Sequence, residues 1–132
     1  MSRDNTSLSG RQRDLVPTLA FLWIWCLPAT LIVFASVAWH RHVISGAVAG
    51  SLLTAGTAWI AAGCYVNARR CKRTHCLIDA ILLPLLFLIG LLNIFHVTSL
   101  SWNSYVDALV IIVVVSFIPE WFGVKYVGRR RA

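Results

Sequence analysis

The stretch CYVNARRCKRTHCLID, residues 64–79, decides how the rest of the chain is interpreted. It carries many reactive and charged side chains, and an apolar run of membrane length flanks it on each side. It holds three of the four cysteines, one of the four histidines and four of the twelve Lys and Arg residues. We therefore expect it to connect two transmembrane helices and to carry most of the chemistry of the chain.

The composition indicates a protein that lies in lipid. Of the 132 residues, 58% are hydrophobic and only 13% are charged, which is far from the averages of soluble proteins. The net charge of +7 would suggest nucleic-acid binding in a soluble protein. Here, however, the basic residues flank apolar runs in clusters, which is typical of topology determinants and of contacts with anionic lipids. We expect the lipid bilayer, and no nucleic acid, as a partner.

Four apolar runs predict an all-α fold, namely a polytopic membrane protein with four transmembrane helices in an antiparallel bundle. The expected spans are about 15–39, 43–66, 77–96 and 104–122. The first run is too long for a signal peptide, so we interpret it as an uncleaved span. Residues 1–14 are polar and predict a disordered cytosolic tail, and residues 123–132 predict a basic cytosolic tail.

The distribution of Lys and Arg predicts the orientation. With the N-terminus in the cytosol, eleven of these residues fall on the cytosolic side and Arg41 alone falls on the outer side. Such an excess is the positive-inside pattern. We therefore expect a multi-pass protein of the bacterial inner membrane, with both termini and residues 64–79 in the cytosol. Because the cytosol is reducing, the thiols in this stretch should be free.

Cys71, His75 and Cys76 form a C-x3-H-C pattern that is a candidate metal site. If the third helix starts early, Cys71 and His75 lie on one face, and Cys64 lies two helical turns before Cys71. Thiolates with one imidazole suit soft or borderline metal ions, of which we consider Cu, Zn and Hg. The alternative is that Cys64 is a packing residue and the other thiols are incidental, since the spacing matches no standard zinc-finger pattern.

The segment Arg70-Cys71-Lys72-Arg73-Thr74-His75-Cys76 resembles the Arg-Cys-Gly-Arg-x-His-Cys box of small uncharacterised bacterial inner-membrane proteins. The resemblance covers the connection and the start of the third span, and Lys72 stands where that family has glycine. It implies that the box acts as a unit in an inner-membrane protein. It implies no particular activity.

Four further ionisable residues, His40, His42, His96 and Asp107, are expected together on the outer side of the membrane. Imidazole and carboxylate groups there form a candidate cation or proton site. The alternative is that the histidines are ordinary interfacial residues and that Asp107 interacts favourably with the N-terminus of its helix.

Two carboxylates inside the spans need partners, because a charged group in the membrane is costly alone. We expect Asp79 to accept hydrogen bonds from Arg73 or from helix N-terminal amides, and Glu120 to pair with Lys125. Both would then have structural roles.

Small residues recur along the second span and predict close helix packing. Gly46, Gly50, Gly56 and Gly63 would let neighbouring helices approach closely, which makes this helix the candidate centre of the bundle. The same surface could instead hold a second copy or another membrane protein.

Three functional hypotheses follow. The first is a small integral membrane protein that binds or transports a soft metal cation through the cysteine and histidine residues. The second is a non-catalytic membrane partner or assembly subunit that docks through the glycine-rich helix, and the third is a membrane thiol-redox protein. The sequence contains no motif of a conventional enzyme class, so no catalytic residue is predicted.

Overall fold

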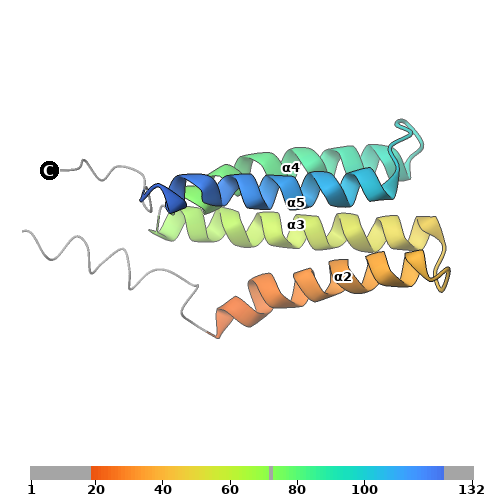
Figure 1. The fold of residues 1–132 in the computed structure, drawn as a ribbon, viewed down its shortest axis with the longest axis horizontal. Coiled ribbons are helices and arrows are strands. Elements are labelled where there is room, and N and C mark those ends of the chain that lie inside the picture. The colour runs from red at the N-terminus through yellow and green to blue at the C-terminus, as the bar shows by residue number, and fades with distance from the viewer. Residues whose placement is uncertain (1–18, 72, 124–132) are drawn as a thin grey trace, which may run out of the picture.

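The computed structural model describes residues 19–71 and 73–123, and its regular elements are helices. In chain order they are η1 (Leu22–Cys26), α2 (Leu27–His40), α3 (Gly46–Cys71), α4 (Thr74–Ile94) and α5 (Trp102–Trp121). Four stretches within them are long and apolar enough to cross a membrane: Leu22–His40, Gly46–Arg70, Thr74–Ile94 and Trp102–Trp121. The prediction of a four-helix transmembrane bundle is thus confirmed (Figure 1). The tail predicted for residues 1–14, and the C-terminal tail beyond Gly123, lie outside the described residues.

The first span has a wide helical turn beside a proline. Residues of η1 are π-helical, and they continue directly into α2, where Pro28 occupies one of the first two positions. Since proline has no backbone N–H, it cannot donate to the carbonyl of the preceding turn, and a local change of helical geometry is the expected response. The Thr30 hydroxyl donates to the Cys26 carbonyl in the same turn. In Figure 1, this span slants away from α3 toward its N-terminal end.

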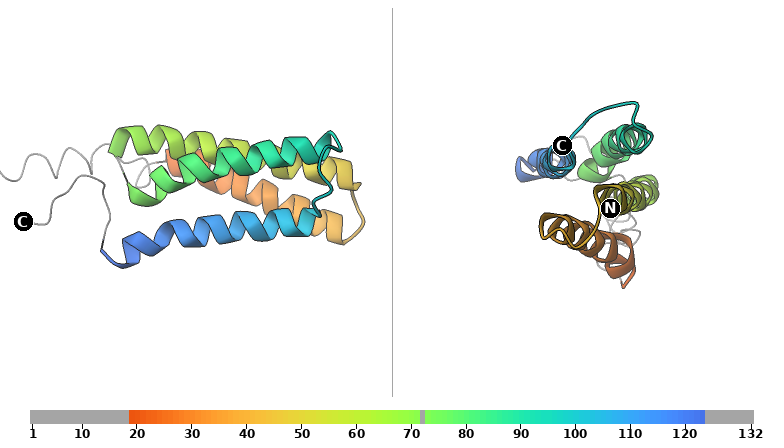
Figure 2. Two further views of the ribbon diagram at one scale, coloured as in Figure 1. Left: turned by 90° about the horizontal axis from the view of Figure 1, so that it is seen from above. Right: turned by 90° about the vertical axis from the view of Figure 1, so that its right-hand side faces the viewer.

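Helix α3 lies at the centre of the packing. It packs along α2 on one side and α4 on the other, while α5 packs mainly on α4 and touches α3 only lightly. The end-on view in Figure 2 shows α3 between α2 and α4, with α5 next to α4. Within the described residues α2 and α5 share no extensive contact, so the bundle is open along that side.

At one end of α3 two glycines face a tryptophan of α5. A Cβ atom added to Gly50 would overlap the indole ring of Trp102, so the ring occupies the space that a side chain would need. Gly46 is packed less tightly, because an added Cβ would lie 4.0 Å from the same ring. The light contact between α3 and α5 therefore depends on Gly50.

The other two glycines of α3 face the first span. A Cβ added to Gly56 would lie 2.7 Å from Ile32 Cγ1, and one added to Gly63 would overlap the Ile24 side chain. The small-residue surface of α3 is thus covered by side chains of η1, α2 and α5 of the same chain, as expected where small residues let helices approach in lipid.

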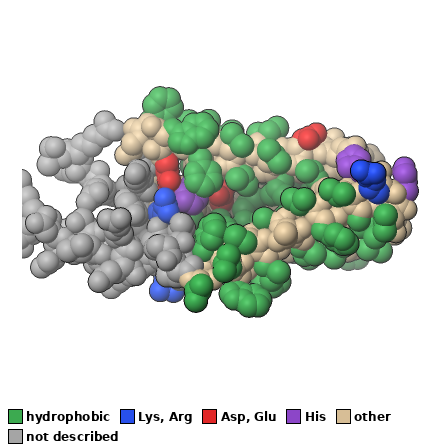
Figure 3. All heavy atoms as spheres, turned by 60° about the horizontal axis from the view of Figure 1, so that its bottom comes forward, with side chains coloured by type: hydrophobic (Ala, Val, Ile, Leu, Met, Phe, Trp, Pro, Cys, Tyr) green, Lys and Arg blue, Asp and Glu red, His purple; other side chains and the backbone are tan. Residues whose placement is uncertain are grey.

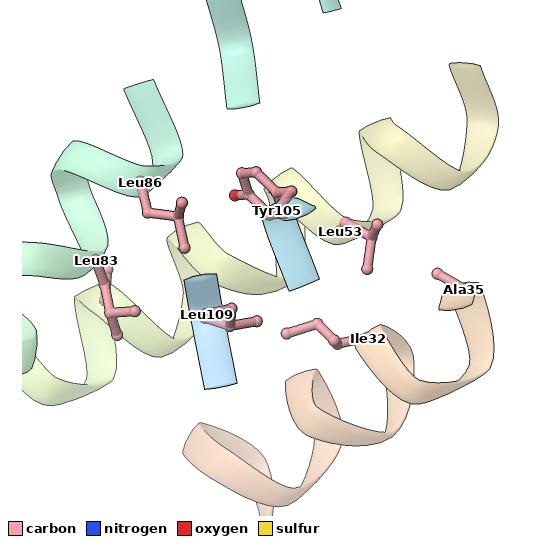
Figure 4. Packing of buried hydrophobic residues seen from close by; sticks show 8 residues of the cluster. Ile32, Ala35, Leu53, Leu83, Leu86, Tyr105 and Leu109 are labelled. Carbon is pink, nitrogen blue, oxygen red and sulfur yellow. The ribbon is translucent and has the colours of Figure 1, made fainter. Parts of the chain in front are cut away.

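The middle of the bundle holds an apolar core. Figure 4 shows that its side chains come from all four spans and point toward one another. The buried members are Ile32, Ala35, Leu53, Ala61, Leu83, Leu86, Tyr105 and Leu109. Many other Val, Leu, Ile and Phe side chains are exposed on the outside of every span. Contiguous apolar surface of this extent is rare on soluble proteins, and it suits contact with lipid.

A buried asparagine organises the connection between α4 and α5. Asn93 Nδ2 donates to the Leu100 carbonyl at 2.8 Å, and Asn93 Oδ1 accepts from the Leu100 N–H at 3.0 Å and from the Thr98 hydroxyl at 3.4 Å. One side chain therefore satisfies both backbone groups of Leu100 in a segment that is not helical.

Replacing Asn93 with alanine should lower the free energy of unfolding by about 1–3 kcal/mol, because the partners in the connection would lose their hydrogen bonds. Chemical unfolding of the purified protein in detergent measures this change. Asn103→Ala, at an exposed position of α5, is the matched control and should have little effect. Equal losses in the two variants would contradict the role given to Asn93.

Candidate functional site

A buried polar cluster lies at the end of the bundle where α3 leads into α4. The last turns of α3 supply Cys64 and Asn67, and the first turns of α4 supply His75, Cys76 and Asp79. All five side chains are buried. The spacings of three and four residues place Cys64 with Asn67, and His75 with Asp79, on common helix faces.

The thiol of Cys76 and the imidazole of His75 are in direct contact. Cys76 Sγ lies 3.1 Å from His75 Nε2 and accepts a hydrogen bond from Asn67 Nδ2 at 3.3 Å. The imidazole also stacks on the Phe117 ring of α5, with 4.4 Å between ring centroids. The sulfur and the ring nitrogen are therefore held in place by residues of three helices.

Glu120 of α5 joins this pair to the connection between α3 and α4. Its Oε1 lies 2.6 Å from His75 Nδ1, and its Oε2 lies 3.3 Å from Arg73 NH2. The carboxylate is an acceptor, so Nδ1 carries a proton and donates, and in the neutral ring Nε2 keeps its lone pair on the side of Cys76. Of the two kinds of donor expected for Asp79, Arg73 and helix N-terminal amides, Arg73 contacts Glu120 in the structure. Lys125, the partner expected for Glu120, lies outside the described residues.

Asp79 lies deeper in the bundle, on the other side of Cys64. Its Oδ2 is 3.9 Å from Cys64 Sγ, and the residue is 3% exposed. Within the described part of the chain, Oδ1 has no hydrogen-bond partner. The Ser116 hydroxyl of the facing helix lies near this carboxylate and donates to the Val113 carbonyl at 2.7 Å. A buried carboxylate oxygen without a donor is costly, and such groups are often functional in membrane proteins.

The cluster opens into an apolar groove of about 450 Å³ on the open side of the bundle. The groove runs between the first span and α5, and Figure 3 shows hydrophobic side chains along both of its edges. Acidic, basic and histidine side chains gather between these edges at the end where α3 leads into α4 (Figure 3). The polar lining residues are Cys64, Arg73, His75 and Asp79. The rest of the lining is aliphatic or aromatic, so the groove combines an apolar wall with a polar end.

Of the predicted metal ligands, the structure brings Cys64, His75 and Cys76 into this cluster, and Cys64 and Cys76 pack together. Cys71 is the last residue of α3, and its side chain lies outside the described residues. Since α4 starts only at Thr74, Cys71 and His75 lie on different helices and not four apart on one helix. Among the described residues, no three His, Cys, Asp or Glu side chains stand ready around a common point as metal ligands.

The outer group is not gathered into one site. His40, His42, His96 and Asp107 are all exposed at the opposite end of the bundle, and within the described chain no hydrogen bond or ion pair joins any two of them. His42 and His96 have φ of 56° and 57° and donate their backbone N–H to the last turns of α2 and α4. Both therefore terminate helices in the left-handed conformation that such ends require.

Three residues of the site were not predicted as site residues, namely Asn67, Asp79 and Glu120, of which Asp79 and Glu120 were expected to have structural roles. Asn67 follows Cys64 by three residues in an otherwise apolar span, which places both on one face. Glu120 is one of only five acidic residues in the chain. The sequence signal was the rarity of a polar group inside a span, which indicates a functional position by itself.

Comparison of the chain with protein-family models, with curated proteins and with solved structures gives no match. The function of the chain is therefore inferred from the buried cluster and the groove.

Proposed function

We propose that this integral membrane protein binds a soft or borderline metal ion, such as Cu(I), Zn(II) or Hg(II), through Cys76, His75 and Cys64. The observation that carries the proposal is the contact of 3.1 Å between Cys76 Sγ and His75 Nε2, with His75 Nδ1 held by Glu120. Thiolate and imidazole are the ligands that such ions prefer.

The surroundings of the pair match the supporting interactions of known metal sites. A ligating histidine usually donates its other ring N–H to a carboxylate, which fixes the tautomer and makes the free nitrogen more basic. Glu120 is placed to do this for His75. A hydrogen bond from Asn67 to the sulfur likewise orients Cys76 and stabilises negative charge on it.

Only a small rearrangement is needed to admit an ion. Bonds of about 2.3 Å to sulfur and 2.0 Å to nitrogen, in tetrahedral geometry, separate the two ligand atoms by about 3.5 Å. The observed separation of 3.1 Å must therefore open by about half an ångström. Cys64 packs against Cys76 and supplies the third ligand by a rotation of its side chain.

The proposal includes the orientation in the membrane. The excess of Lys and Arg supports a placement of both termini, and of the connection between α3 and α4, in the cytosol of a bacterial inner-membrane protein. The thiols would then lie close to a reducing compartment, which keeps them available as ligands.

Replacing Cys76 with serine should weaken metal binding by more than about a hundredfold, since loss of a supporting residue alone costs 10–100-fold. The purified protein is loaded with Zn(II) or Cu(I) in detergent, desalted and analysed for metal content, and affinity is measured by competition with a chelator. About one ion per chain is expected for the unchanged protein.

Cys26→Ser is the matched control, because Cys26 is a thiol of the first span that takes no part in the cluster. It should bind metal as the unchanged protein does. Circular dichroism establishes that both variants keep their helices. Metal content that is equal in the Cys76→Ser variant and in the control would refute the proposal.

A further inference from the structure

The groove beside the cluster has an unusual combination of groups at its polar end. Its volume of about 450 Å³ lies in the range of small-molecule sites. Asp79 lines it, is 3% exposed and has no hydrogen-bond partner for Oδ1 within the described residues. The other carboxylate of the cluster, Glu120, already contacts Arg73 and His75. Within the described residues, the acceptor atom left without a donor at the groove is thus Oδ1 of Asp79, since Oδ2 lies 3.9 Å from Cys64 Sγ.

Aromatic rings line the groove as well. Phe21 and Trp25, at the start of the first span, lie with their ring centroids 5.6 Å apart. Phe117 of α5, which stacks on His75, also lines the groove. Aromatic faces attract cations, most strongly when water is excluded, and sites for quaternary ammonium groups use such rings. A carboxylate together with aromatic rings in an apolar groove favours a positively charged and lipid-soluble ligand.

We infer that the groove binds a lipid-soluble organic cation, of the quaternary ammonium or phosphonium class, with Asp79 as its counter-ion. The apolar part of the ligand lies along the aliphatic and aromatic lining, and its charge lies near Oδ1. Binding removes the ligand cation from lipid, where an unpaired charge is costly, and places a positive charge beside Asp79 Oδ1, which has no hydrogen-bond partner within the described residues. The groove shares Cys64 and His75 with the proposed metal site, but Asp79 is not one of the proposed metal ligands.

The test uses two probes of the same shape and opposite charge. The full-length protein in lipid nanodiscs is titrated with radiolabelled tetraphenylphosphonium and, separately, with tetraphenylborate, and empty nanodiscs measure simple partition into lipid. Saturable binding of the cation, and none of the anion, is expected. Saturable binding of both ions alike, or of neither, would overturn the inference.

Asp79→Asn removes the charge at nearly unchanged size and should weaken phosphonium binding at least about tenfold. Asp107→Asn is the matched control, because Asp107 is an exposed carboxylate at the opposite end of the bundle. It should leave the affinity unchanged. The inference fails if the two variants bind the cation equally well.

A second pair of variants tests the groove itself and leaves the polar cluster intact. Ala29 is exposed and lines the groove, so Ala29→Trp should fill it and abolish saturable binding. Ala62→Trp, at an exposed position of α3 away from the groove lining, should bind normally. Binding that survives in Ala29→Trp would contradict the location. Metal content measured in parallel separates this result from the proposed function, because Ala29 is not a metal ligand.

Discussion

Replacement of Glu120 by alanine should lower the free energy of unfolding by about 3–5 kcal/mol, the usual cost of removing one partner from a buried ion pair. The carboxylate is 8% exposed and contacts both Arg73 and His75. Without it, the guanidinium loses its ion pair with Glu120, and the imidazole loses the acceptor at Nδ1. Unfolding in mixed detergent, followed by circular dichroism, measures the change.

Two variants make this result specific. Glu120→Gln retains a hydrogen-bond acceptor but not the charge, so its free energy of unfolding should lie between that of Glu120→Ala and that of the unchanged protein. Asp107→Ala removes an exposed carboxylate of the same helix and should change stability by less than about 0.5 kcal/mol. A loss of stability no larger in Glu120→Ala than in Asp107→Ala would show that the buried pair contributes nothing.

The second large effect is expected at Gly50. Substitution by leucine should lower the free energy of unfolding by about 3 kcal/mol, at the upper end of the cost of overpacking. An added Cβ already overlaps the Trp102 ring, so the larger side chain must push α5 away from α3. Unfolding in mixed detergent, followed by circular dichroism, measures this change as well.

The tryptophan provides an internal control for this clash. If Trp102 is replaced by alanine in the Gly50→Leu background, the leucine gains room, and part of the lost stability should return. Ala55→Leu, at an exposed position of α3, should be nearly neutral. Strictly additive losses in the Gly50→Leu and Trp102→Ala double variant would mean that the two residues do not interact.

The four spans could be predicted from the sequence because membrane-length apolar runs carry their own signal. The position of Gly50, Gly56 and Gly63 at helix contacts agrees with the expected role of small residues, since only they allow such a close approach. These features depend on local composition, which can be read directly from the sequence.

The partners inside the cluster could not be predicted in the same way. Glu120 and His75 are 45 residues apart, and their contact depends on how α5 is rotated about its own axis. In a soluble protein an amphipathic stripe would reveal that rotation. In α5 the Val and Ile residues of 110–115 occupy exposed and half-buried positions alike, so no stripe indicates which face carries Glu120 inward.

The break between α3 and α4 explains why Cys71 and His75 do not lie on one helix face, as the sequence pattern had suggested. Arg73 is extended, with φ of −65° and ψ of 138°, and α4 begins immediately after it. The direction of the chain therefore reverses between Cys71 and His75. The pattern of cysteines and histidine suggested one helical face, whereas the fold builds the cluster from Cys64 and Asn67 of the preceding helix.

Within the described residues α2 and α5 lack an extensive contact, and this has a consequence for any occupant of the groove. A molecule dissolved among the acyl chains would reach Asp79 from the side, through the groove between the first span and α5. The occupancy of the groove by this molecule then follows the mole fraction of the molecule in the bilayer, and phospholipid tails compete with it for the apolar lining. Bilayer thickness and acyl-chain saturation would tune the apparent affinity even though no amino acid had been changed.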